Sequence, residues 1–267
     1  MGLKKVNEGL VAVTLHNILQ EHEKWFDQFI ESVASTYGFI DPKIGLSKSM
    51  ATSGLKVLLT FDDGFRSNRV VAEKILAKHG VRGVFFLTEK FIGLSSGDAF
   101  SFASKRFYPN SKLRIANISQ FEPMSWDDVY WLIENDHVIG AHTTTHPNLS
   151  EINSEDQLTD EIIGSADRME EKLRTKINNF SYPFGNISAI NISSERLARK
   201  RFKFSFSNIR GNLEISPSRS FLYRQNIDPA NDPTWLAKAI VEGKLNWIYG
   251  QARKKAKAEF SKLSWLK

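Results

Sequence analysis

The chain has 267 residues, of which 41% are hydrophobic and 12% aromatic, so it can bury a core large enough for one barrel-sized domain or two small ones. It contains no cysteine, which excludes disulfides, thiolate metal sites and cysteine nucleophiles and leaves His, Asp and Glu as the available metal ligands. Residues 251–267 carry +5 of the formal net charge of +6, so the rest of the chain is nearly neutral and no basic groove for nucleic acid is expected over it.

Strand and helix signals alternate along the chain, first as a strand at 55–61 and a helix at 67–80 with Ser67 as its N-cap. A strand follows at 81–88, and the stretch 93–123 reads as too polar for core. Ser125, with Asp128 three residues later, predicts a capped helix at 125–136. Further strands are expected at 137–142, 178–183 and 202–208, with helices at 154–176 and 193–201. Asp232-Pro233 then opens a C-terminal helical region as N-cap and first helical residue.

The polar residues that interrupt this pattern fall at the carboxyl ends of the expected strands. Strands that alternate with helices indicate a mainly parallel α/β sheet. Asp62-Asp63, His142 and residues 183–185 each follow such a strand. In a (β/α) barrel these ends meet on one face, whereas an open doubly wound sheet would spread them along an edge. The barrel is the predicted fold.

Two carboxylates and two histidines suggest a metal-assisted site. Successive strand residues point to opposite faces, so Asp62 and Asp63 can serve one site only if the strand stops there and Gly64 lets the backbone turn. His142 and His146 are four residues apart, a spacing that can present two imidazoles to one ion. Two histidines and one carboxylate leave positions open for water and substrate.

Three segments resemble the motifs of a known family. "LTFDDGF", "WDDVYWLIENDHVIGAHTTTHPNLS" and "FSYPFGN" are similar, in order and spacing, to the motifs of the polysaccharide deacetylase family, also called carbohydrate esterase family 4 or the NodB homology domain. The resemblance runs from about residue 9 to residue 230 and implies a distorted (β/α) barrel.

The resemblance also implies roles for individual residues. It implies a divalent metal, most often zinc, bound by Asp63, His142 and His146, and Asp62 as the general base. The backbone N–H of Phe184 would help to hold the oxyanion, and Tyr182 is placed with it as an oxyanion or substrate contact.

Two positions depart from the family pattern. Ser181 stands where the third motif often has the arginine that orients the base, and Arg224 is the candidate to replace it. The usual general acid is a late histidine, but no histidine follows His146. His16 either lines the pocket or is a polar strand end.

Other residues have structural interpretations. His137 is expected to be structural. Trp126 and Trp131, at helical spacing, are expected in the core.

The sequence therefore predicts a metal-dependent hydrolase that removes an N-acetyl group from an amino sugar of a nucleotide- or lipid-linked saccharide during surface glycan synthesis. A deformylase or other C–N hydrolase with the same site, or an inactive metal-bearing module that binds glycan, are the alternatives. The barrel is expected at 1–243 and a basic amphipathic helical tail at 244–267. No signal peptide is read, so a cytoplasmic location is expected, with weak binding of the tail to anionic membranes.

Overall fold

The computed structural model describes residues 9–45, 54–109, 115–213 and 221–260. Its strands are β1 (Gly9–Leu15), β2 (Leu55–Phe61), β3 (Gly83–Leu87), β4 (Val138–Ala141), β5 (Asn179–Ser181), β6 (Phe204–Phe206) and β7 (Gln225–Asn226). Its α-helices are α1 (Glu23–Thr36), α2 (Pro42–Gly45), α3 (Arg66–Val71), α4 (Ser96–Arg106), α5 (Trp126–Glu134), α6 (Glu155–Thr159), α7 (Ser165–Leu173), α8 (Ile192–Arg201), α9 (Thr234–Val241) and α10 (Gly250–Phe260). Two π-helical turns, η2 (Ala72–Leu76) and η5 (Asp160–Gly164), continue α3 and join α6 to α7.

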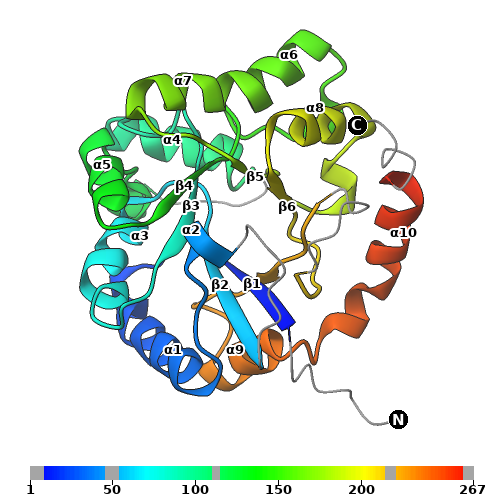
Figure 1. The fold of residues 1–267 in the computed structure, drawn as a ribbon. Helices are drawn as coiled ribbons and strands as arrows, with labels where there is room; N and C mark the ends of the chain where they lie inside the picture. Colours follow the sequence, from blue (N-terminus) through cyan, green and yellow to red (C-terminus); the bar gives the residue numbers. More distant parts are fainter. Residues whose placement is uncertain (1–8, 46–53, 110–114, 214–220, 261–267) are drawn as a thin grey trace.

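The strands form a curled parallel sheet in the order β6-β5-β4-β3-β2-β1-β7, and the helices surround it as a ring (Figure 1). The segment from Leu222 to Asn226 closes the ring, because Leu222 bridges Phe206 of β6 and the two residues of β7 pair with Val13 and Thr14 of β1. The predicted distorted (β/α) barrel is therefore confirmed. An open doubly wound sheet would leave its edge strands far apart.

Alternation along β2 decides which residues enter the barrel. Leu58 belongs to the apolar cluster that fills the barrel interior, with residues of β1, β3 and β6. Its neighbours Leu59 and Phe61 face the other way and pack in the main core between sheet and helices. The inward positions continue as Thr60 and then Asp62, both fully buried. Strand alternation thus aims Asp62 into the barrel mouth.

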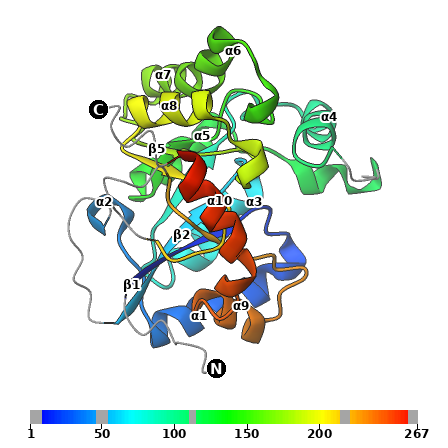
Figure 2. The ribbon, with the colours of Figure 1, turned by 90° about the vertical axis from the view of Figure 1, so that its right-hand side faces the viewer.

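The stretch 93–123 is not the polar connection that its composition suggested. It contains α4, whose N-cap Ser95 accepts a hydrogen bond from the N–H of Asp98, and it contributes to a separate buried cluster. This cluster, which we call the aromatic cluster, consists of Phe65, Phe91, Ala99, Ala103, Phe107 and Phe121. Its rings meet edge to face, with Phe65 in contact with three of the others. In Figure 2, α4 projects from one side of the barrel.

The sequence predicted where three helices start, and the structure confirms one of these starts and differs at the other two. Ser125 and Asp128 form the predicted capping box of α5. Ser67 is not an N-cap: α3 begins at Arg66, and the Ser67 hydroxyl instead donates to Asn17 and accepts from the N–H of Ile18. Pro233 is the N-cap of α9, so the helix starts one residue later than predicted. The helix α1 has no counterpart among the predicted elements.

The two tryptophans of α5 lie against the main core, as expected. Trp126 and Trp131 are half-buried and pack on it, and each ring also faces a cation, Lys172 and Arg69 respectively.

The C-terminal helix α10 crosses from the α9 side of the barrel toward α8 (Figure 2). Ala256 and Phe260 are buried, and the Phe260 ring meets Phe221 at 5.5 Å. The tail residues Leu263, Trp265 and Leu266 lie outside the described residues, so the predicted division of the chain at 243/244 stays a prediction. None of the described helices is both long and apolar enough to span a bilayer.

Candidate metal and catalytic site

Asp63 reaches the barrel mouth through a tight turn. The N–H of Gly64 donates to the carbonyl of Asp62 at 3.0 Å, and Asp63 between them has φ of 77°. A bond from residue i+2 to residue i with positive φ at the centre is the rarer and more strained form of γ-turn. Gly64 follows with φ of 98°, and a Cβ there would lie 2.6 Å from Ile92. The turn brings both adjacent carboxylates into one site.

Asp63, His142 and His146 form a buried cluster whose ligand atoms all lie within 4.8 Å of one another. Nδ1 of His142 lies 2.7 Å from the carbonyl oxygen of Ser181, and Nδ1 of His146 lies 3.1 Å from that of Arg106. A carbonyl can only accept, so both Nδ1 atoms carry the proton and both Nε2 atoms are left as ligands. These Nε2 atoms lie 3.5 and 3.6 Å from Oδ1 of Asp63.

The charges of this cluster favour a cation. Burial and the nearby His142 lower the pKa of His146 to about 4, which leaves its imidazole neutral. Burial opposes ionisation of Asp63, but the histidines outweigh it and the pKa of Asp63 is lowered. Within the described residues no lysine or arginine pairs with Asp63. Two neutral imidazoles and one buried carboxylate are a donor set that fits a divalent metal.

Arg224 contacts Asp62, as the sequence analysis predicted. Its Nη1 and Nη2 donate to Oδ1 and Oδ2 of Asp62 at 2.8 and 2.7 Å, and both side chains are fully buried. The Arg224 Nη2 also donates to Ser181 and Asn208, and its Nε donates to the carbonyl of Ser207. Burial raises the pKa of Asp62, but the Arg224 charge outweighs this and the net shift is downward. Asp62 is thus held ionised in a fixed orientation.

Phe184 and Tyr182 have different surroundings. Phe184 has φ of 60°, lines the pocket and stacks edge to face on His146 at 4.8 Å. A bond from Gly185 N–H to the Pro183 carbonyl makes Phe184 the centre of a second γ-turn. Tyr182 is fully buried, its ring packs on Phe180, and its N–H donates to Phe206. This corrects the expectation that Tyr182 contacts substrate, because the alternation of β5 turns its ring into the core.

A cavity of about 520 Å³ opens over these groups at the carboxyl ends of the strands. His16, directly after β1, lines it together with Asp63, His142 and His146. Of the two interpretations of His16, the pocket-lining one is therefore correct.

Sequence reasoning missed the contribution of α4 to this pocket. The last residue of α4, Arg106, supplies the carbonyl that orients His146, and the Phe107 ring lies 4.9 Å from that imidazole at 89°. Tyr108 lines the pocket as well. A backbone carbonyl leaves no mark in a sequence, although the phenylalanines between 91 and 121 were a signal that the segment is not purely polar.

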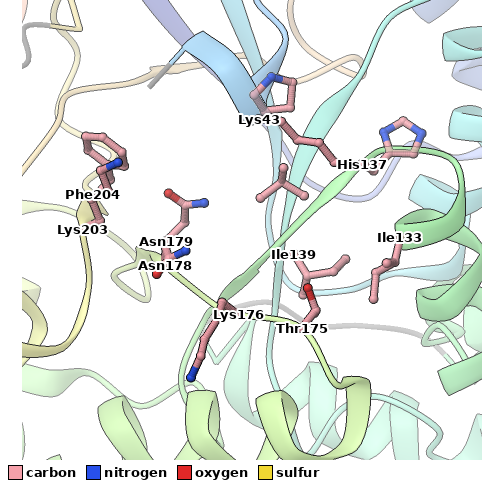
Figure 3. A pocket seen from close by; sticks show the side chains of 12 residues that line it. Lys43, Ile133, His137, Ile139, Thr175, Lys176, Asn178, Asn179, Lys203 and Phe204 are labelled. Carbon is pink, nitrogen blue, oxygen red and sulfur yellow. The ribbon is translucent and has the colours of Figure 1, made fainter. Parts of the chain in front are cut away.

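The opposite end of the barrel holds a second cavity of about 300 Å³ (Figure 3). It lies at the amino ends of β4, β5 and β6, and His137 is among its lining residues. Nδ1 of His137 accepts from the N–H of Gly83 at 3.1 Å, which ties the start of β4 to the start of β3. His137 therefore has the expected structural position, remote from the metal cluster.

Comparisons with known proteins agree with this geometry. The family model described as polysaccharide deacetylase matches residues 49–200. No curated protein matches the chain.

Solved structures share the fold at low sequence identity. IcaB from Ammonifex degensii is 19% identical with a TM-score of 0.65, over 88% of this chain and 97% of its own. The deacetylase PplD of Streptococcus pyogenes is 17% identical with a TM-score of 0.64, over 89% and 99%. A de-N-acetylase from Aggregatibacter actinomycetemcomitans is 16% identical with a TM-score of 0.61, over 87% and 98%. With more than half of its length matched by the family model, the chain belongs to the polysaccharide deacetylase family, hydrolases that act on carbon–nitrogen bonds.

Proposed function

We propose that the protein is a metal-dependent deacetylase that removes the N-acetyl group of an amino sugar. The observation that carries this proposal is the placement of two carboxylates with separate partners: Asp63 with His142 and His146, and Asp62 with Arg224. One carboxylate is available to a metal and the other to a proton. Metal-assisted hydrolysis of an amide uses both a bound ion that activates water and a base that accepts the proton of that water.

Each residue of the site has a separate proposed role in the hydrolysis. Asp63, His142 and His146 would hold the ion, which when bound lowers the pKa of water and polarises the amide carbonyl. Asp62 takes the proton of the attacking water, because Arg224 holds it ionised with its oxygens fixed. The N–H of Phe184 makes no hydrogen bond within the described part of the chain and is the donor assigned to the oxyanion.

His16 is the proposed proton donor to the leaving amine. It takes the place of the late histidine that the sequence lacks, because it lines the same cavity as Asp63, His142 and His146. An amine must be protonated to leave, whereas 4-nitrophenolate leaves without a proton. His16→Gln is therefore expected to lower amide hydrolysis by about 10²-fold or more while 4-nitrophenyl acetate hydrolysis and metal content stay near wild type. Equal loss of both activities would contradict this role.

The proposed function is tested by incubating metal-loaded protein with acylated amino sugars and measuring loss of mass. A panel with matched N-acetyl and N-formyl groups separates a deacetylase from a deformylase. We expect each acetylated member to lose about 42 mass units, because hydrolysis replaces the acetyl group on nitrogen with a hydrogen atom. Asp62→Asn serves as the inactive control. No loss from any member would instead favour a metal-bearing module that binds glycan.

We further propose that the saccharide is linked to a carrier and that the protein binds anionic membranes weakly. Trp247 and Ile248 are 71% and 54% exposed, and the adjacent Tyr249 lines the cavity, so an apolar surface adjoins the mouth of the site. Lys254 and Lys255 of α10 are exposed a few residues further along. Exposed aromatic residues beside lysines suit the interface of an anionic bilayer. Zinc as the metal, a role in surface glycan synthesis and a cytoplasmic location stay predictions.

A further inference from the structure

Arg210 is a guanidinium in the catalytic cavity that has no carboxylate partner within the described part of the chain. It lines the cavity together with Asp63, His142 and His146, and its Nη1 is buried without a hydrogen-bond partner among the described residues. Among the described residues no aspartate or glutamate forms an ion pair with it. The guanidinium carbon lies 5.7 Å from the ring centroid of Tyr249.

The backbone of Arg210 is held on both sides. The carbonyl of the preceding Ile209 accepts from the N–H of Arg224 at 3.2 Å, and the carbonyl of Arg210 accepts from Arg253 of α10. The following Gly211 lies so close to Tyr223 that a Cβ would approach it to 2.6 Å. Arg210 is therefore presented to the cavity by a fixed segment.

The acidic groups of the cavity are already committed. Asp62 is paired with Arg224, and Asp63 belongs to the metal cluster. The carboxylate of Asp228 accepts from the N–H of Ala230 at 3.0 Å and from the amide of Asn231 at 2.7 Å. A guanidinium stays charged at every accessible pH, and a partly buried charge without an acceptor is unfavourable. An acceptor from the ligand would satisfy it.

A second unsatisfied atom belongs to a residue that lines the same cavity. Oδ1 of Asn226, at the end of β7, is buried and has no hydrogen-bond partner in the parts of the chain that the structure describes. Such an oxygen accepts from a hydroxyl or an amide N–H. A cationic donor and a neutral acceptor together are complementary to a sugar that carries both an anionic group and free hydroxyls.

We propose that the substrate is an acylated amino sugar bearing a phosphoryl group, which Arg210 binds, while Asn226 accepts a hydrogen bond from a hydroxyl of the sugar. Guanidinium binds phosphate through paired N–H donors, with a geometry that lysine cannot reproduce. The inference rests on the proposed deacetylase function and specifies its substrate as a sugar phosphate or a sugar linked to a carrier through phosphate.

The test compares two probes, N-acetylglucosamine 1-phosphate and methyl N-acetylglucosaminide, by ligand-observed NMR titration of the metal-loaded protein. Binding and release of acetate are read from the same spectra. Wild type is expected to bind the phosphate probe about 10-fold or more tightly than the neutral one, the usual worth of a hydrogen bond to a charged group. Arg210→Gln should abolish this preference without changing affinity for the neutral probe, and Arg210→Lys should retain part of it.

Arg196→Gln is the matched control, because it removes the same charge from α8, where Arg196 pairs with Glu155. It should leave the preference intact. Equal binding of both probes by wild type, or a preference that survives in Arg210→Gln, would overturn the inference even if acetate is released. Conversely, an Arg210-dependent preference without release of acetate from either probe would support the anion site and refute the deacetylase function.

Discussion

At the scale of single residues, two adjacent aspartates have different tasks because the backbone turns between them. Asp62 continues the inward alternation of β2 and meets Arg224, whereas Asp63 is the strained centre of a γ-turn and meets the histidines. Of the six non-glycine residues with positive φ in the described part of the chain, Asp63, His146 and Phe184 belong to this site, and a fourth, Thr143, accepts a hydrogen bond from the N–H of His146. Strain of this kind persists only where surrounding contacts impose it.

The two aspartates are therefore expected to fail differently when each is changed to asparagine. Asp62→Asn should keep metal but lower turnover by about 10²–10⁴-fold, because an amide cannot accept the proton of water. Asp63→Asn should lower metal affinity, with partial recovery of turnover in excess metal. Metal analysis with turnover measured across metal concentrations checks both. An Asp63→Asn variant that binds metal like wild type would refute the ligand assignment.

Arg224 is expected to act on turnover through Asp62. Arg224→Lys keeps the charge but loses the two-pronged contact, so turnover should fall at least about 10-fold with metal content unchanged. The same variant should lose about 3 kcal/mol or more of unfolding free energy, because it disturbs a fully buried pair.

Ser181→Ala is the matched control for Arg224→Lys. It removes a hydroxyl that donates to Asp62 at 3.1 Å and accepts from Arg224, but it leaves the ion pair in place. Its effect on turnover and stability should be clearly smaller. Wild-type turnover in Arg224→Lys would show that the contact has no catalytic consequence.

At the scale of elements, His137 joins β4 to β3 and makes that junction sensitive to pH. Burial, with Arg82 and Lys43 nearby, lowers the pKa of His137 to about 4 from an ordinary value of 6.5. The unfolded chain therefore binds a proton between about pH 6.5 and 4 that the folded chain does not. Stability should be full above pH 6.5 and fall by about 3 kcal/mol as the pH drops to 4.

His137→Asn should remove this part of the pH dependence. An asparagine oxygen can still accept from Gly83 but does not titrate in that range. Denaturant unfolding at several pH values measures the effect, with the half-buried His22→Asn as control. Other groups contribute equally to both curves, so the slope difference between wild type and His137→Asn isolates His137. Identical slopes would contradict a buried neutral imidazole.

Also at this scale, α4 is an element that the amino-acid composition of its segment did not predict. The phenylalanines of the aromatic cluster are spread from residue 65 to residue 121 and become a core only when the loop folds over Phe65. A periodic pattern within a single segment cannot predict such a cluster, because its members are far apart in the sequence. Its position matters to the site, since α4 ends at the carbonyl that orients His146.

At the scale of the whole molecule, the barrel could be predicted because it depends on local patterns, whereas the choice of Asp63, His142 and His146 as candidate metal ligands came from the resemblance to the family motifs. Short windows of sequence contain the patterns that predict the barrel. These patterns are strand alternation, helix periodicity and the placement of polar residues after strands. Side-chain direction at Tyr182 and the backbone acceptors at Ser181 and Arg106 depend on tertiary packing, so they could not be read in the same way.

The membrane proposal also belongs to the whole molecule. Because Ala256 and Phe260 anchor α10 on the barrel, point variants are preferable to deletion of the helix. Changing the exposed Lys254, Lys255 and Lys257 together to glutamine should weaken sedimentation with anionic vesicles by about 100-fold, at about 1 kcal/mol per residue.

The matched control changes three other exposed lysines, Lys24, Lys74 and Lys78, to glutamine. It alters net charge equally but leaves the α10 surface intact, so vesicle binding should stay near wild type. Equal binding by both triple variants would assign any attraction to total charge and end the proposal of a dedicated surface.

The closing segment from Leu222 to Asn226 sets an order of events during synthesis. Translation delivers both aspartates, His142 and His146 well before Arg224, which arrives on the last piece of the barrel wall. A nascent chain that stops short of this segment contains Asp63, His142 and His146, the proposed metal ligands, but leaves Asp62 without its buried partner. Hydrolysis is therefore expected only after the segment that contains Arg224 has been synthesised and folded. A fragment that ends before residue 224 should show no hydrolytic activity.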